Sequence, residues 1–206
     1  MEREYFEEIS KHLMEDLKPS EFLNSISKEN AFKEYPYNML YSLKDTSQNL
    51  VHHPEGNVWN HTMMVVDEGA KRRAKSKKPE VFMWATLLHD IGKAPTTKLR
   101  KGRITSYDHD KVGRELTEKF LREVTSDEDF INEVAAIVRW HMQPLCIAKN
   151  LAFSGIRGML SEVDLDEISL FSLCDRLGRG NMSPEKAEEE RKNVELFTKK
   201  CRKYLN

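Results

Sequence analysis

Six potential metal ligands occupy apolar stripes with helical spacing, and this pattern restricts the possible folds more than any other feature of the chain. Side chains three, four and seven positions apart share one face of a helix. His141, for example, follows Val134, Ile137 and Val138 along such a face. The side chains placed in this way are His61, His89, Asp90, His109, His141 and Asp175. We therefore expect five helices to point these polar groups into a common interior.

Burial of these six groups requires compensation. An unpartnered neutral polar group in a protein interior costs roughly 1–3 kcal/mol, and a carboxylate costs several kcal/mol. The sum for this set is on the order of 10 kcal/mol, which rivals the whole stability of a domain, about 5–15 kcal/mol. Hydrogen bonds can compensate one or two of these residues, whereas bound metal compensates all of them. The pattern therefore predicts a metal site.

The ligand chemistry narrows the choice of metal and reaction. Imidazoles and carboxylates without thiolates favour Mn, Fe, Co, Ni or Zn. Six protein ligands are more than one catalytic ion takes if it keeps open positions, so two neighbouring ions bridged by Asp90 are expected. Two divalent ions, two aspartates and a bridging hydroxide leave about one positive charge, which attracts a phosphate oxyanion. Hydrolysis of a phosphate ester is the chemistry that follows.

Composition places few limits on partners. The 206 residues fit a single structural domain, and 39% hydrophobic with 33% charged residues is typical of a soluble globular protein. A net charge of −1 gives no global attraction to nucleic acid. The three cysteines have no Cys-x-x-Cys spacing, which indicates a reducing compartment, and the acidic amphipathic start contains no apolar run like a signal or membrane span. We expect a cytoplasmic protein without membrane association.

The periodicity predicts an all-α fold with one small β-hairpin. The hairpin is expected in TTKLRKGRITSY, with its turn around Lys101, Gly102 and Arg103. One helix is expected to open at Pro79 and to carry His89 and Asp90. The other helices are predicted at about residues 2–17, 20–30, 37–44, 58–74, 110–124, 127–142, 153–163, 166–179 and 184–204.

Five segments in this order resemble one known family. They read HPEGNVWNHTMMVVDEGA, ATLLHDIGKAPTT, GRITSYDHDKVG, IVRWHMQP and LCDRLGRG, and together they span residues 53–180. His61, the doublet of His89 and Asp90, and Asp175 resemble the signature of the HD-domain metal-dependent phosphohydrolases. His109 and His141 look like the extra ligands of its two-metal members. The match is closest to the HD domain that follows the catalytic head of bacterial tRNA nucleotidyltransferases.

The resemblance implies an HD-domain helical bundle with a small hairpin insertion. It divides the chain into an N-terminal helical cover (1–50), the HD domain (51–182) and a C-terminal helix (183–206), all within one structural domain. No glycine-rich nucleotidyltransferase motif with paired aspartates precedes the HD segments. The resemblance therefore implies a stand-alone phosphomonoesterase or phosphodiesterase rather than CCA addition. Expected substrates are a nucleotide, a cyclic nucleotide, an RNA-end phosphate or another phosphorylated small molecule.

Residues near the ligands are candidates for contact with substrate. Lys93, one helical step beyond Asp90, is expected to hold a substrate phosphate or to lie solvated at a helix end, and family resemblance supports the first role. Arg176 and Arg179 can clamp phosphate, although a surface ion pair is equally compatible with Arg176. Glu68, two turns after His61, is a candidate for orienting a ligand or for the catalytic acid, or it pairs with Arg72. His53 matches a family landmark and is expected near the pocket.

Two basic runs, residues 71–78 and 98–103, are candidate RNA-binding segments. The competing interpretation is a solvated helix end and a solvated turn, and no interleaved aromatic residue indicates base stacking. Two other functions fit the ligands. One is a di-iron oxygenase, which some relatives with the same ligands imply, and the other is an RNA-binding or signalling module with a structural metal.

Overall fold

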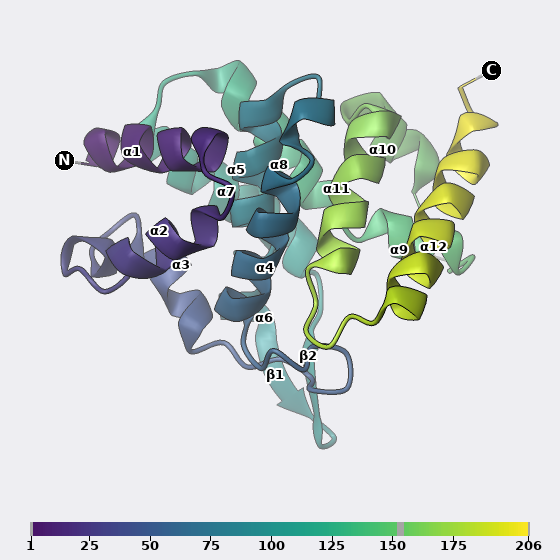
Figure 1. Cartoon of the computed structure of the whole chain (residues 1–206), viewed down its shortest axis with the longest axis horizontal. Helices are drawn as coiled ribbons and strands as arrows, with labels where there is room; N and C mark the ends of the chain where they lie inside the picture. Colours follow the sequence, from purple (N-terminus) through teal and green to yellow (C-terminus); the bar gives the residue numbers. More distant parts are fainter. Residues whose placement is uncertain (1, 152–154, 206) are drawn as a thin grey trace.

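Helices carry nearly all of the regular structure, and the predicted all-α fold with one hairpin is confirmed (Figure 1). The computed structural model describes residues 2–151 and 155–205. Its α-helices are α1 (Glu2–Glu15), α2 (Pro19–Ile26), α3 (Asn38–Tyr41), α4 (Val58–Ala70), α5 (Pro79–Leu88), α6 (Lys93–Thr96), α7 (His109–Val124), α8 (Glu128–Trp140), α9 (Gln143–Ala148), α10 (Ile156–Glu162), α11 (Leu165–Leu177) and α12 (Pro184–Arg202). Short 3₁₀ helices lie at Ala31–Lys33, Ser42–Lys44 and Arg73–Lys75.

Local capping explains where the long helices begin. The side chains of Asn57, Asp127, Asp164 and Ser183 each accept a hydrogen bond from a backbone N–H in the first turn of α4, α8, α11 and α12. Proline lies in the first turn of α2, α5 and α12, where its missing N–H is not needed.

Several predicted helix boundaries need correction. The helix predicted at 20–30 ends at Ile26, and the helix predicted at 58–74 ends at Ala70. The helix predicted at 153–163 is described from Ile156, and residues 153 and 154 lie outside the described residues. Helix α9 was not predicted, because its six residues are too few to display a periodic apolar stripe.

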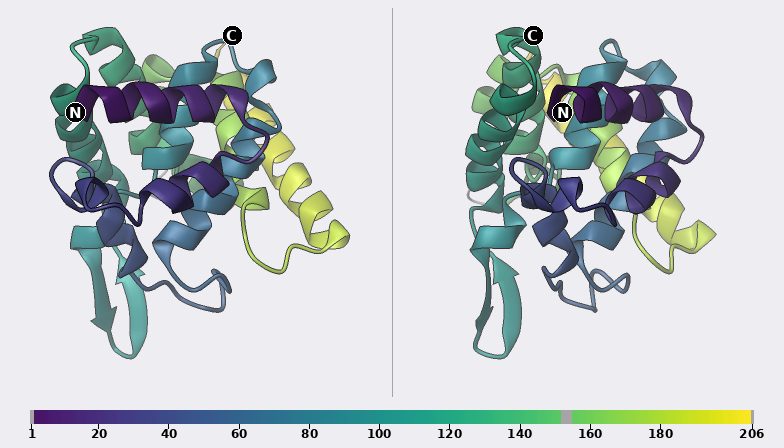
Figure 2. Two further views of the ribbon diagram at one scale, coloured as in Figure 1. Left: turned by 60° about the vertical axis from the view of Figure 1, so that its left-hand side comes forward. Right: turned by 90° about the vertical axis from the view of Figure 1, so that its left-hand side faces the viewer.

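The core is shared by helices from the whole length of the chain. Helix α5 contacts α4, α8 and α11 at the centre, and α4 also contacts α11, while α1 and α2 pack on one side and α12 packs against α11 and α9 on the other (Figures 1 and 2). Leu13 from α1, Trp84 from α5, Phe171 from α11 and Phe197 from α12 are each 0% exposed and belong to one hydrophobic cluster. All three cysteines are buried free thiols. Among the described helices, none has both the length and the apolar character that a membrane crossing requires.

The β-hairpin projects from the helical body (Figure 2). Strands β1 (Thr97–Arg100) and β2 (Arg103–Ser106) pair antiparallel, with Thr97 opposite Ser106 and Arg100 opposite Arg103. The two turn residues Lys101 and Gly102 have φ values of 49° and 73°. Positive φ at both central residues is the requirement of a type I′ turn, whose twist matches the flanking strands. The turn predicted from the sequence is therefore correct.

Gly92 sets the packing distance between the end of α5 and the start of α7. A Cβ atom at this position would lie 2.0 Å from the His109 carbonyl oxygen and 2.6 Å from the Gly113 nitrogen. Because backbone atoms cannot yield as a flexible side chain can, we expect Gly92→Ala to lower the free energy of unfolding by about 3 kcal/mol. Urea denaturation measures this loss.

Gly155→Ala is the matched control for Gly92→Ala. Its added Cβ would meet the Trp140 ring at 3.4 Å, an ordinary contact, so its cost should stay below about 1 kcal/mol. Equal stability of the two variants would contradict the close-packing argument.

Candidate metal centre

The structure brings the six predicted ligand side chains together in the core. They come from α4, the C-terminal end of α5, the N-terminal end of α7, the C-terminal end of α8, and α11. Each residue is only 1–8% exposed. The residues are His61, His89, Asp90, His109, His141 and Asp175.

All four imidazoles are held in the same tautomer by the backbone. Each Nδ1 lies 2.6–3.0 Å from a carbonyl oxygen, which only accepts, so Nδ1 carries a proton and Nε2 is the nitrogen that a metal can reach. His61 Nε2 also lies within hydrogen-bond distance of Asp175 Oδ1, at 3.1 Å. The pairs are His61 with Gly178, His89 with Thr86, His109 with Ser106, and His141 with Val138. This outer hydrogen bond is the arrangement usually found behind metal-bound histidine.

The Nε2 atoms surround Asp90 in two groups. On one side, Asp90 Oδ2 lies 3.2 Å from His89 Nε2 and 3.8 Å from His61 Nε2. On the other side, Asp90 Oδ1 lies 3.6 Å from His109 Nε2 and 3.7 Å from His141 Nε2. Asp175 Oδ1 joins the first group at 3.1 Å from His61 Nε2. Asp90 thus lies between two sets of nitrogen ligands, as a bridging carboxylate must.

The unsatisfied atoms at this centre fit a cation. His109 Nε2 and His141 Nε2 face each other at 3.2 Å, and with both Nδ1 atoms protonated these are two lone pairs in repulsive contact. His89 Nε2 is buried without a hydrogen-bond partner among the described residues, and it faces Asp90 Oδ2, the carboxylate oxygen that also pairs with Lys93. Buried acceptors without donors are costly, and a divalent ion would satisfy them together.

The protonation states match those that metal binding needs. Burial and the neighbouring His109 lower the pKa of His141 to about 3, and burial also lowers the pKa of His109. Burial alone would raise the pKa of Asp90, but the attraction of His89 and Lys93 holds it well below its usual value. At neutral pH these groups are therefore neutral imidazoles and a charged carboxylate, which are the ligating forms.

Glu55 supports His61 and was not predicted from the sequence. Its carboxylate is 4% exposed and lies 3.1 Å from His61 Nδ1 and 2.9 Å from His53 Nδ1. Burial alone would raise the pKa of Glu55, but hydrogen bonds from the two histidines hold it far below its usual range. Hydrogen bonds that His61 donates to Asp175 and Glu55 in turn outweigh burial and raise the pKa of His61. The HPEGN segment has no helical periodicity, so its sequence does not predict where the Glu55 side chain points. The one signal for Glu55 was the presence of an acidic residue close to His52 and His53.

A cavity of about 350 Å³ opens onto this centre. Among the described residues, Asp90 and Asp175 are the only acids that line it. Four permanently charged basic residues line it as well, namely Lys93, Lys149, Arg176 and Arg179. The wall beyond the ligands therefore attracts anions.

Lys93 is not the solvated residue of the alternative interpretation. Its side chain is 12% exposed, and Nζ lies 2.7 Å from Asp90 Oδ2 and donates to Gln48 Oε1 at 2.7 Å. Gln48 is a second residue that the sequence pattern did not reveal, because it lies in an irregular loop. Lys93 therefore lies at the cavity wall, in direct contact with the candidate ligand Asp90.

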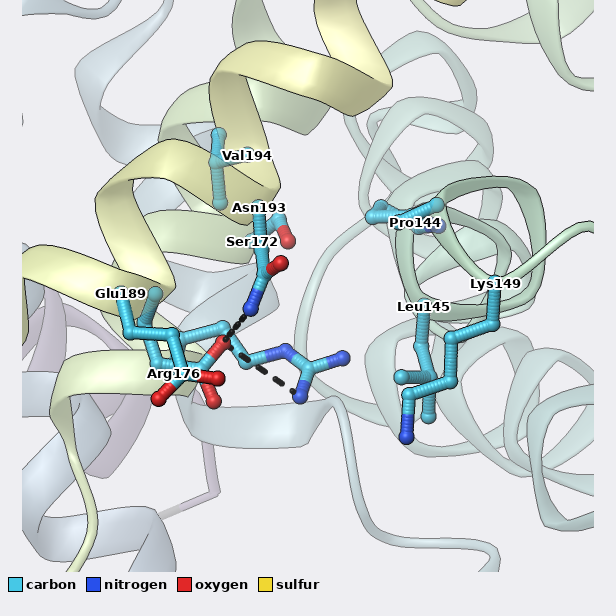
Figure 3. Close-up of a pocket in the computed structure, with 10 residues that line it drawn as sticks. Pro144, Leu145, Lys149, Ser172, Arg176, Glu189, Asn193 and Val194 are labelled. Carbon is cyan, nitrogen blue, oxygen red and sulfur yellow. Dashed lines mark hydrogen bonds and ion pairs between the residues drawn. The ribbon is translucent and has the colours of Figure 1, made fainter. Parts of the chain in front are cut away.

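The other predicted contact residues have different surroundings. His53 lines the cavity, and Arg179 lines it with a buried Nε that has no partner among the described residues. Arg176 is 12% exposed and lies 3.7 Å from Glu190 Oε2 of α12, beside a second cavity between α9 and α12 (Figure 3). Arg176 lines both cavities, so it lies at the boundary between the cavity beside Glu190 and the cavity of the candidate metal centre.

Glu68 lies outside the site, which corrects the sequence prediction. Its carboxylate pairs with Lys71 and Arg72, and it does not line the cavity. The spacing from His61 placed it correctly on one helix face, but seven residues also shift it by roughly 10 Å along the axis. The pairing with Arg72 is the alternative that the structure supports.

Comparison with known proteins agrees with this geometry. A model of the HD domain matches residues 57–180, more than half of the chain. The chain belongs to the HD domain family. It is 36% identical over 93 residues to an A-adding tRNA nucleotidyltransferase of Deinococcus radiodurans, covering 41% of this chain and 21% of that protein. It is 30% identical over 141 residues to a multifunctional CCA protein of Azoarcus sp., covering 65% of this chain and 32% of that protein.

The resemblance to the HD domains of tRNA nucleotidyltransferases is thus confirmed. A multifunctional CCA protein of Pseudomonas syringae is 32% identical over 104 residues, or 50% of this chain and 24% of that protein. The chain spans only 21–32% of the length of these three relatives. What they share with it is the HD domain.

The lowered pKa of His141 predicts an acid-sensitive metal-free protein. The unfolded chain binds a proton at His141 below pH 6.5, whereas the folded chain does so only near pH 3, so stability falls as the pH falls through this window. At about 1.4 kcal/mol per pH unit, the loss from His141 between neutrality and about pH 5 is about 2 kcal/mol. Urea denaturation of EDTA-treated protein at about pH 7 and about pH 5 measures it.

His141→Gln provides the control for this pH dependence. The variant lacks the titrating imidazole, so the difference in unfolding free energy between the two pH values should shrink by about 2 kcal/mol. An unchanged difference would show that His141 is not held neutral.

Proposed function

We propose that this HD-domain protein is a metal-dependent phosphohydrolase that acts on a nucleotide, a cyclic nucleotide or an RNA-end phosphate. The observation that carries the proposal is the set of four imidazoles whose Nε2 atoms surround Asp90, beside a cavity lined by four basic side chains. The imidazoles and Asp90 would hold metal ions, and the basic side chains would attract the phosphate anion. The name of the Deinococcus radiodurans relative, which refers to tRNA, supports an RNA-end substrate.

The donor set supports two divalent transition-metal ions among Mn, Fe, Co, Ni and Zn. His61, His89, Asp90 and Asp175 would hold one ion, and Asp90, His109 and His141 would hold the other. Ions of this kind supply a Lewis acid for a phosphoryl oxygen and lower the pKa of a bound water. Asp90 would take part in both groups, because one of its carboxylate oxygens faces each pair of histidines.

The basic residues would bind and orient the phosphate. Lys93 and Arg179 lie beside the two aspartates, with Lys93 already in contact with Asp90 and Arg179 lowering the pKa of Asp175. Arg176 reaches the same cavity from beside Glu190. A volume of about 350 Å³ lies within the usual range for small-molecule sites, about 300–1,000 Å³. The cavity therefore has room for one nucleotide end.

The charge of the cavity wall favours hydrolysis over the oxygenase alternative. A dioxygen-activating site needs no cluster of permanent cations, whereas a phosphate ester gains charge-assisted hydrogen bonds from each one. The three buried free thiols support our expectation that the protein works in the reducing cytoplasm.

Asp90→Ala is expected to abolish metal loading and hydrolysis together. The substitution removes the carboxylate shared by both ligand groups, so bound metal should fall by at least about 90%. Elemental analysis and hydrolysis of nucleotides and cyclic phosphodiesters by Mn-loaded protein measure the two effects. Glu68→Ala removes a carboxylate of α4 that lies outside the cavity, and both properties should stay at the wild-type level. Full activity of the Asp90 variant would disprove the bridging role.

Lys93→Ala is expected to weaken substrate binding while the metal stays bound. Loss of one charge-assisted hydrogen bond to phosphate should raise KM about ten-fold. Steady-state kinetics and elemental analysis test this pair of outcomes. Lys111→Ala, which removes an exposed lysine paired with Asp108 and away from the cavity, is the control. A Lys93 variant that loses its metal would instead assign the lysine a structural role.

A further inference from the structure

The two basic runs of the sequence have different surroundings in the folded chain. In residues 71–78, Lys71 and Arg72 pair with Glu68, Lys77 pairs with Asp164, and Lys78 pairs with Glu133. Arg73 donates to backbone carbonyls of α1 and of the turn that follows it. This run is largely neutralised by the protein itself, so a solvated structural role accounts for it.

The basic side chains of the hairpin lack such partners. Among the described residues, no carboxylate forms an ion pair with Lys98, Arg100, Lys101 or Arg103. No acidic residue interrupts the sequence from 97 to 107. On a chain with a net charge of −1, this projecting hairpin is therefore a local concentration of unpaired positive charge (Figure 2).

The strand register separates the hairpin into two faces. Ile104 and Ser106 share one face with Thr97 and Leu99. Of these four residues, Ile104 and Ser106 line the cavity of the metal centre. Lys98, Arg100 and Arg103 share the opposite face, which we call the outer face. The hairpin therefore forms a wall of the cavity with one face and presents its charge on the other.

An exposed aromatic ring extends the outer face. Tyr107 is 65% exposed, and the guanidinium carbon of Arg100 lies 4.8 Å from its ring centroid. Arg100 also donates to Thr105 Oγ1 at 2.6 Å, which fixes it across the strands. No aromatic residue is interleaved within 98–103, but strand pairing brings Tyr107 beside Arg100, seven positions away in the sequence.

We propose that the outer face of the hairpin binds a single-stranded polynucleotide whose terminal phosphate enters the cavity on the other side. This rests on the proposed function for the role of the cavity. Cations spaced along two strands suit successive backbone phosphates, and an exposed ring beside an arginine suits a stacked base. The face is open, which suits a chain better than a small anion. A polynucleotide that crosses the hairpin edge therefore meets both faces.

Binding of fluorescently labelled single-stranded 12-nucleotide RNA and DNA, followed by anisotropy, tests the proposal. Replacement of Lys98, Arg100, Lys101 and Arg103 by Gln should weaken binding about ten-fold or more at moderate salt. It should also reduce the slope of log K against log salt by about two to three. The matched control replaces Lys71, Lys75, Lys77 and Lys78 by Gln. This control variant loses the same amount of positive charge, but from the run that is largely neutralised by ion pairs. Its affinity for the oligonucleotides should therefore stay within about two-fold of the wild type.

Tyr107→Ala provides a second variant that leaves the charge unchanged. Loss of one stacked base should weaken binding about ten-fold without changing the salt slope. Circular dichroism and metal content establish that the variants are folded. Stronger binding of a duplex than of either single strand, or equal weakening by both four-residue variants, would overturn the proposal. So would equal competition by poly-glutamate.

A kinetic comparison separates this inference from the proposed function. For a wild-type protein that hydrolyses phosphate esters, the hairpin variant should lose activity on an oligonucleotide end and keep it on a mononucleotide. Equal loss on both substrates would contradict the inference. A protein that hydrolyses neither would contradict the proposed function, and the binding measurements would still decide the role of the hairpin.

Discussion

The hydrogen bond from each imidazole Nδ1 to a backbone carbonyl is the interaction on which the centre depends. Thr86 and Val138 lie in the last turns of α5 and α8, Ser106 ends β2, and Gly178 follows α11. Carbonyls at helix ends have no partner within the helix, so they are free to accept from a side chain. The ends of the secondary structure thus fix the tautomer, and the tautomer fixes which nitrogen faces Asp90.

Close backbone packing sets the distances between these ends. A Cβ on Gly178 would lie 2.8 Å from both the Cα and the nitrogen of Val65, which shows how tightly the end of α11 rests on α4. This contact holds Asp175 and His61 at 3.1 Å. Gly92 does the same between α5 and α7, where Asp90 meets His109. At both places the absence of a side chain determines where a ligand lies.

Helical spacing was sufficient to predict that the six candidate ligands converge in the core, but not which residues support them. The six candidate ligands lie on stripes with a fixed period, so burial of the stripe predicts their direction. Glu55 and Gln48 lie in a loop, where no period relates position to direction. Glu68 was misplaced because periodicity gives the angle around a helix but not the distance along it. Contacts across strands, such as Arg100 with Tyr107, depend on a register that composition does not contain.

Four consecutive residues connect the hairpin to the metal centre. The Ser106 carbonyl accepts from His109, and Ser106 itself lines the cavity, while Tyr107 extends the outer face of the hairpin. Asp108 then turns the chain into α7 with a φ of 58°, so that His109 begins the helix at the ligand position. Because one short segment positions a ligand, a cavity wall and an exposed ring, movement of the hairpin on binding would be transmitted to His109. If the hairpin binds a polynucleotide as proposed, that binding and the arrangement of the candidate ligands would be coupled through the backbone of residues 106–109.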